Sequence, residues 1–97
     1  MLNMSEEKPL KKVIDQLLRA YGYQDQLDEL DLIKAYEDVA GKMFANHTKN
    51  IYYKNKTLHI HLDSAALKQE LSYMKEPIIL KLNQVIGRRI VEDIIIK

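Results

Sequence analysis

The hydrophobic period of this chain changes twice, and no other feature of the sequence constrains its fold as strongly. Apolar residues recur at steps of three and four up to about residue 46, alternate over residues 48–63, and return to helical steps after residue 64. Steps of three and four place side chains on one face of a helix, whereas alternation places them on one face of a strand. Because 97 residues hold one small core, the sequence predicts a single α+β domain.

The first helix is predicted over residues 9–21. Pro9 suits a first helical turn, where its missing N–H group would have no partner, and Gly22 suits the position just past a helix end. The apolar face of this helix consists of Leu10, Val13, Ile14, Leu17, Leu18 and Tyr21.

The second helix is predicted to begin between Asp25 and Asp28 and to run to about Asn46. Gly41 lies inside it and costs about 1 kcal/mol relative to alanine, so we expect a kink there or the close approach of another element. The apolar stripe of this helix consists of Leu27, Leu30, Ile33, Tyr36, Ala40, Met43 and Phe44.

A β-hairpin is predicted over residues 48–63, with its turn at residues 54–56. Asn55 is the residue best able to adopt a positive φ in that turn. In the first strand Ile51 and Tyr53 share a face. The second strand alternates apolar side chains toward the core with histidines toward solvent, namely Leu58, Ile60 and Leu62 against His59 and His61.

A further helical pattern follows Ser64, which is a typical N-cap residue. Because Pro77 lies within the pattern, the segment is either one helix kinked at Pro77 or two helices, the second with proline in its first turn. Gly87 ends the pattern, and the β-branched segment Ile90 to Ile96 is predicted to be the last strand. The apolar stripe consists of Leu67, Leu71, Met74, Ile78, Leu82 and Val85.

The resulting order α-α-β-β-α-β predicts helices packed on one face of a three-stranded sheet. The helix between the second and third strands permits these two strands to run parallel. Residues 1–7 are expected to form a disordered N-terminus, which leaves residues 8–97 as the domain.

Composition and motifs exclude several classes of protein. The absence of cysteine rules out disulfides and thiolate zinc sites and agrees with a reducing compartment, so a cytoplasmic protein is expected. The sequence has no glycine-rich phosphate loop and no converging acid, base and nucleophile, so neither an enzyme nor a cofactor is expected. No apolar run approaches the ~20 residues of a membrane span.

The three histidines, His47, His59 and His61, raise the question of a metal site. His59 and His61 share a strand face, but a stable site needs further ligands and only Asp63 is close in sequence. The interpretation as ordinary surface histidines is favoured, since exposed strand faces are usually polar.

Charge is distributed unevenly along the chain. Residues 25–38 contain six acids and one base, whereas residues 39–61 contain four lysines and no acid. A basic surface on the hairpin half is typical of phosphate binding, with Tyr52 available for stacking. Lysines beside hairpin turns also protect sheet edges, so the alternative is a purely structural role. The candidate nucleic-acid-binding residues are Lys42, Lys49, Lys54, Lys56, Arg88 and Arg89.

Several motifs together resemble the DciA family of bacterial replicative-helicase loaders. They begin with Tyr36-Glu-Asp-Val-Ala-Gly-Lys-Met-Phe-Ala-Asn-His-Thr and continue with Leu58-His-Ile-His-Leu-Asp-Ser. Tyr36 stands where the family has a tryptophan, and Leu67 where a second aromatic residue is usual. The remaining matches are Glu70-Leu71, Leu82-Asn83 and Gly87.

The resemblance implies a KH-like domain that binds DNA and contacts the DnaB-type hexameric helicase. The Gly-x-x-Gly loop with which KH domains grip nucleic acid is absent, so that binding mode does not carry over. The leading hypothesis is a non-enzymatic adaptor that binds DNA weakly through its phosphates and helps to place or activate the helicase. The alternative is a protein–protein interaction module, self-associating or not, without nucleic-acid binding.

Overall fold

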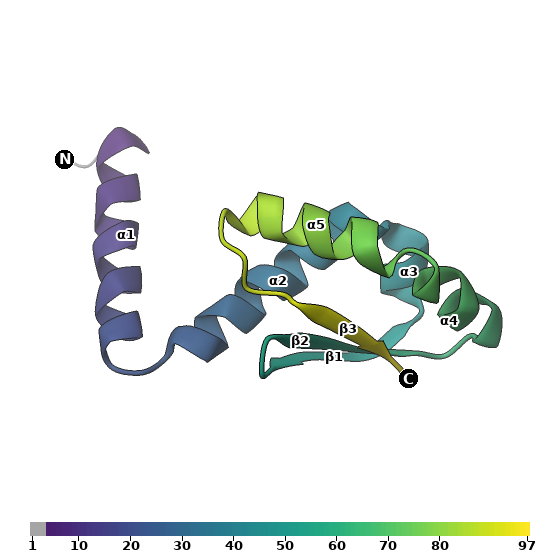
Figure 1. Cartoon of the computed structure of the whole chain (residues 1–97). Coiled ribbons are helices and arrows are strands. Elements are labelled where there is room, and N and C mark those ends of the chain that lie inside the picture. Colours follow the sequence, from purple (N-terminus) through teal and green to yellow (C-terminus); the bar gives the residue numbers. More distant parts are fainter. Residues whose placement is uncertain (1–3) are drawn as a thin grey trace.

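The computed structural model describes residues 4–97 and has the predicted mixed α+β architecture (Figure 1). Its elements are α1 (Met4–Ala20), α2 (Gln24–Ala40), α3 (Lys42–Asn46), β1 (Thr48–Lys54), β2 (Thr57–Leu62), α4 (Ala65–Ser72), α5 (Lys75–Ile86) and β3 (Asp93–Ile96). Among these residues, no helix combines the length and the apolar character that a membrane span needs.

The sheet has the strand order β1-β2-β3, with β2 in the centre. β1 pairs antiparallel with β2, and β2 pairs parallel with β3, so that Leu58 lies opposite both Tyr53 and Ile94. The parallel pair is connected through α4 and α5, as the helical segment between the two strands predicts. The predicted helices-on-one-face arrangement is confirmed for α2 to α5, which lie above the sheet in Figure 1.

The hairpin turn consists of two residues in the left-handed region. Asn55 has a φ of 53° and Lys56 a φ of 59°. Two consecutive positive φ values define the type I′ geometry, whose twist matches that of the flanking strands. Asn55 was expected to adopt this conformation, and Lys56 adopts it as well.

The core lies between the inner face of the sheet and the helices. The three apolar residues that were predicted to point inward from β2 are fully buried, and Leu32, Leu71, Leu82, Val91 and Ile94 pack with them. Each buried leucine or isoleucine contributes roughly 1.5–3 kcal/mol to folding. The alternation of β2 therefore supplies the central layer of this small core.

The second predicted helix is two helices, α2 and α3, and its predicted stripe is partly wrong. Gly41 has a φ of 98° and separates them, and a Cβ at this position would meet nothing within 4 Å. The glycine is therefore required by backbone conformation and not by close packing. Three residues of the predicted stripe are exposed, and the buried face of α2 is Asp28, Leu32, Ala35 and Tyr36.

The segment after Ser64, for which the sequence allows either one helix kinked at Pro77 or two helices, consists of two helices, α4 and α5. The Ser64 side chain accepts a hydrogen bond from the Leu67 amide and caps α4, as expected, and Pro77 lies in the first turn of α5. Gly87 ends α5 in the left-handed conformation. β3 begins only at Asp93, because the buried residues before it belong to the connection from α5 and not to the sheet. Val85, the last residue of the predicted stripe, is exposed.

Helix α1 stands away from the rest of the molecule (Figure 1), which measures 51 × 27 × 22 Å along its principal axes. All of its apolar stripe is exposed, with Val13 at 58% and Leu17 at 54% of their maximum accessibility. Helix α1 therefore does not take part in the packing of helices on the sheet. The helix also begins at Met4 and not at Pro9, so residues 4–7 of the N-terminus expected to be disordered are helical, and residues 1–3 lie outside the described part.

Candidate nucleic-acid interface

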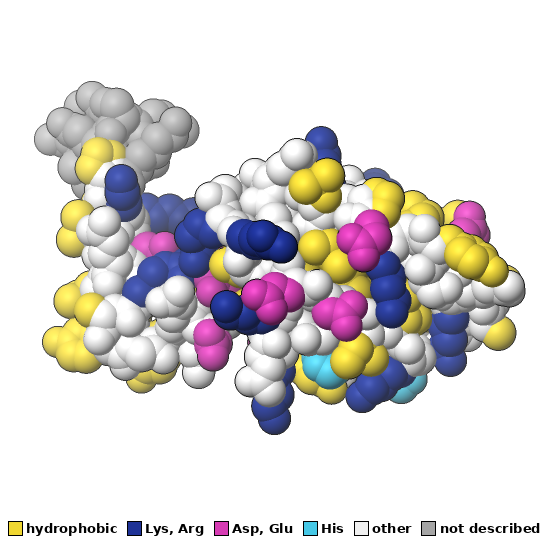
Figure 2. Space-filling view, viewed as in Figure 1, with side chains coloured by type: hydrophobic (Ala, Val, Ile, Leu, Met, Phe, Trp, Pro, Cys, Tyr) yellow, Lys and Arg dark blue, Asp and Glu magenta, His cyan; other side chains and the backbone are white. Residues whose placement is uncertain are grey.

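The structure brings three of the six candidate cations together at one end of the sheet. Lys56 of the hairpin turn lines a hollow of about 500 Å³ together with Arg88 and Arg89 of the α5–β3 connection. Lys56 lies more than thirty positions before the two arginines in the sequence. Lys54 directly precedes the turn on β1. In Figure 2 dark blue side chains gather in the region between α1 and the body of the molecule. We call Lys54, Lys56 and Arg89 the basic cluster.

Tyr53 fixes the hairpin against this connection. Its backbone N–H donates to the Glu29 carboxylate at 2.9 Å, and its hydroxyl donates to the Ile90 carbonyl at 2.5 Å. Burial raises the pKa of the Tyr53 hydroxyl, and the charge of Asp28 raises it further, so the group remains a protonated donor at neutral pH. The hairpin is thereby joined to α2 and to the α5–β3 connection that carries the two arginines.

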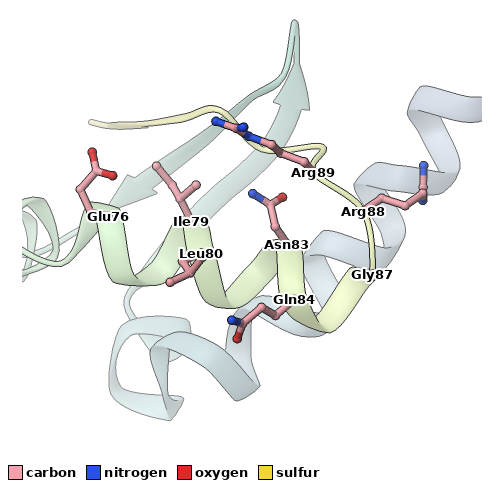
Figure 3. A pocket seen from close by; sticks show the side chains of 8 residues that line it. All are labelled: Glu76, Ile79, Leu80, Asn83, Gln84, Gly87, Arg88 and Arg89. Carbon is pink, nitrogen blue, oxygen red and sulfur yellow. The ribbon is translucent and has the colours of Figure 1, made fainter.

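Asn83 determines the path of the connection that carries the arginines. Its side-chain oxygen accepts from the amides of Ile90 and Val91 at 3.0 and 2.9 Å, and its amide nitrogen donates to the Val91 carbonyl at 2.9 Å. In Figure 3 Arg88 and Arg89 point in opposite directions from this connection. Both arginines are among the residues that line the hollow of about 590 Å³ beside α5.

Arg88 binds a buried carboxylate. Its guanidinium donates to Asp28 Oδ1 at 2.6 Å, and Arg19 donates to the same oxygen at 2.9 Å. Asp28 is only 3% exposed, so the two guanidinium groups compensate a charge that water cannot reach. The prediction of Arg88 as a DNA-binding residue therefore concerns a side chain whose charge is already paired within the molecule.

The acidic run of α2 is more than the solvated face that the sequence indicates. Asp28 is buried, Glu29 holds the hairpin, and Asp31 lies 3.7 Å from Arg19. Asp15 of α1 also pairs with Arg19, at 3.3 Å. The hydrogen bond to Asp28 is the main cause of a raised pKa of Arg19, which is consistent with a permanently charged guanidinium. These contacts link the end of α1 to the domain.

The other predicted cations are distributed over the surface. Lys49 lies at the opposite end of β1, where its Nζ is 3.5 Å from Asp63, and Lys56 Nζ is 3.6 Å from Glu92. Both lysines remain largely exposed, so these pairs contribute little and leave the charges accessible. Lys42 begins α3, apart from the basic cluster. Within residues 9–97, the candidates without an ion pair are Lys42, Lys54 and Arg89.

His47 and Asp63 join the start of β1 to the end of β2. His47 Nδ1 lies 2.8 Å from Asp63 Oδ1, and because a carboxylate only accepts, the imidazole must be the donor. This hydrogen bond, more than the nearby positive charges, lowers the pKa of the Asp63 carboxyl. Within residues 9–97 no three histidine, aspartate or glutamate side chains are grouped to hold a metal ion.

The lowered pKa of Asp63 predicts a pH-dependent contribution to stability. The carboxylate favours the folded state fully above its unfolded pKa of about 3.9, and this contribution is lost as the pH falls through the lower folded pKa. We expect Asp63→Asn to unfold at lower urea concentration than the native chain at neutral pH, with the difference vanishing at the acid end of the titration. Asp38→Asn, whose carboxylate is exposed, serves as the control and should show no such difference.

Several motif residues of the DciA resemblance are structural. Tyr36, Leu58, Leu71 and Leu82 are buried. The Tyr36 hydroxyl lies 3.1 Å from Thr48 Oγ1, and Thr48 Oγ1 donates to the Phe44 carbonyl at 2.7 Å. Burial raises the pKa of the Tyr36 hydroxyl, so it stays protonated. These motif residues therefore stabilise the α2–β1 junction and the core.

Comparison with known proteins finds a matching family. The family described as "Dna[CI] antecedent, DciA" matches residues 9–96, nearly the whole chain. Neither a curated protein nor a solved structure matches the chain. The match covers the helices, the hairpin and the crossover strand described above, and it assigns the chain a role in DNA replication as a loader of the DnaB-type helicase. The chain therefore belongs to the DciA family.

Proposed function

We propose that this protein is a non-enzymatic adaptor that binds the DNA backbone through its basic cluster while it loads the replicative helicase. The observation that carries this proposal is the convergence of Lys56 and Arg89, from distant parts of the sequence, on one hollow at the end of the sheet where Lys54 precedes the hairpin turn. Loading a helicase brings the loader close to DNA, and so cytoplasmic action at the chromosome is expected. The fold is interpreted as a KH-like variant without the Gly-x-x-Gly loop.

Backbone binding by a few cations has a recognisable dependence on salt. Each phosphate that a lysine or arginine neutralises releases counterions, and the logarithm of the association constant then falls by about 0.9 per contact for each unit of log salt concentration. Three accessible cations give weak binding with little sequence preference. The expected complex is therefore weak and strongly weakened by salt.

The test replaces Lys54 and Arg89 together with glutamate. Because neither side chain has an ion pair or an apolar packing role within residues 9–97, stability should change by no more than about 0.5 kcal/mol. The affinity for labelled DNA, measured by fluorescence anisotropy over a range of salt, should fall, and the salt slope should decrease by roughly two units.

Lys81→Glu with Lys68→Glu is the matched control, since it makes the same change of charge on α4 and α5, outside the hollow that Lys56 and Arg89 line. The control should bind DNA as the native chain does. Equal loss of affinity in both double variants would show that net charge, and not the basic cluster, governs binding.

The exposed apolar face of α1 favours the second candidate, a protein–protein interaction module. An unpaired apolar stripe on a projecting helix is typical of a protein contact surface. The two candidates differ in the same titration. If neither single-stranded nor duplex DNA binds at low salt, the interaction module stands and the DNA-binding proposal is wrong.

A further inference from the structure

The sheet has a second face, on the side away from α2 to α5. Alternation along the strands places Tyr52 and Asn50 of β1, His59 and His61 of β2, and Lys97 after β3 on that side, opposite the buried residues of β2. We call these five residues the open sheet face. No described element covers this side of the sheet, which is the lower side in Figure 1.

Two aromatic rings stack at the centre of the open sheet face. Tyr52 and His59 are direct cross-strand partners, and their rings are parallel, with a centroid separation of 4.4 Å and an interplanar angle of 6°. Cross-strand aromatic pairs stabilise hairpins, so part of their role is structural. His59 Nδ1, however, is buried without a hydrogen-bond partner among the described residues, which costs folding free energy. Hairpin stability alone gives no reason for this cost.

A hollow adjoins the stacked pair. It measures about 330 Å³ and is lined by the five residues of the open sheet face together with Ile60. This volume lies in the range of small-ligand sites, and the walls combine flat rings with polar groups. The Asn50 amide and the His61 ring can hydrogen-bond to the edge of a planar heterocycle.

Positive charge flanks the aromatic pair. Lys97 Nζ lies 6.0 Å from the centroid of the Tyr52 ring. Lys54 is on the same strand and the same face as Tyr52, two residues toward the hairpin turn. A chain of phosphates that follows the sheet from Lys54 to Lys97 would therefore meet a cation at each end of the aromatic pair. A ligand that carries flat rings on an anionic backbone fits this order of groups.

We propose that the open sheet face binds unpaired bases of single-stranded DNA, with one base in the hollow stacked against the Tyr52 and His59 pair and the flanking phosphates beside Lys54 and Lys97. This inference rests on the proposed DNA-binding function and adds the form of DNA that is bound. Bases of a duplex are stacked on one another and cannot reach a ring on a sheet surface. The open sheet face therefore selects single strands, whereas phosphate contacts alone do not.

The test compares oligothymidylate with an abasic oligonucleotide of the same length, which has the same phosphates and no bases. The native chain should bind oligothymidylate about tenfold more tightly than the abasic strand, which corresponds to the stacking of one base. Tyr52→Ala should bind both strands equally, because it removes the ring and leaves the cations. Tyr52→Phe should keep the preference, and circular dichroism melting should show that each variant is folded.

The outcomes separate this inference from the proposed function. A native chain that binds both strands equally, or a folded Tyr52→Ala variant that keeps the preference for bases, overturns the open sheet face while backbone binding stands. Preference for duplex DNA over oligothymidylate overturns it as well. A native chain that binds no DNA at low salt overturns both proposals. If bases stack as described, the salt slope of Tyr52→Ala should equal that of the native chain, since stacking releases no counterions.

Discussion

Replacing Asp28 with alanine should lower the free energy of unfolding by about 3 kcal/mol. The carboxylate is buried and holds both Arg19 and Arg88, so its removal leaves Arg88 without its anion and Arg19 with only the more exposed carboxylates of Asp15 and Asp31. Loss of one partner from a buried ion pair costs 3–5 kcal/mol, and the lower end applies here because the arginines are partly exposed and can regain water. Urea denaturation followed by circular dichroism measures the loss.

Asp31→Ala is the control for this experiment. Asp31 also lies near Arg19, at 3.7 Å, but its side chain is about half exposed, and such surface pairs contribute little. We expect a change of no more than ~0.5 kcal/mol. If Asp28→Ala is as mild as the control, the triad of Arg19, Asp28 and Arg88 does not hold the α1–α2 corner to the α5–β3 connection.

Leu71→Ala should destabilise the protein by ~2–5 kcal/mol. The side chain is completely buried at the end of α4 and belongs to the core cluster between the sheet and the helices. The substitution removes apolar contacts and leaves a cavity that the neighbouring helices fill only in part. Since a domain of this size has a total stability of only about 5–15 kcal/mol, the loss is a large fraction of it.

Leu80→Ala makes the same chemical change on the exposed side of α5. Leu80 is 62% exposed, so its truncation should change stability by only a few tenths of a kcal/mol, on the order expected for surface positions. Thermal melting of the two variants should differ by more than about 10 °C. Similar melting temperatures would mean that α4 is not docked against the sheet.

The elements that could be predicted from the sequence are those whose pattern is local. Alternation fixes which side of β2 is buried, and the positive φ of Asn55 follows from a short hairpin turn that lacks glycine. Ser64 and Gly87 mark helix ends by their own chemistry. In each case the local conformation is determined by the residue itself and its neighbours in sequence.

The errors arise where the cause lies elsewhere in the chain. Asp28 occupies a core position of α2 because Arg19 and Arg88 neutralise it, and neither is near it in the sequence pattern. A helical stripe was therefore assigned to Leu30 and Ile33, which are exposed, in place of the face that contains Leu32. A polar residue in phase with a buried leucine four positions later was the signal available for Asp28.

The candidate site was partly predictable for the same reason. Lysine side chains beside a hairpin turn face solvent, so Lys54 and Lys56 could be predicted from the sequence as exposed candidate DNA-binding residues. The pairing of Arg88 with Asp28 could not, because it depends on how the α5–β3 connection crosses α2. The open sheet face required the register that places Tyr52 opposite His59.

Because α1 projects from the domain, its apolar residues and the core residues are subject to different constraints. Residues that form a core are constrained by folding, and any change in them alters how much protein survives in the cell. The apolar stripe of α1 contributes almost nothing to the core, so mutations there leave folding intact and are judged only by what the helix touches. Substitutions in the stripe of α1 are therefore expected to change what the helix contacts while leaving stability unaltered, whereas substitutions in the core of the sheet and its helices lower stability.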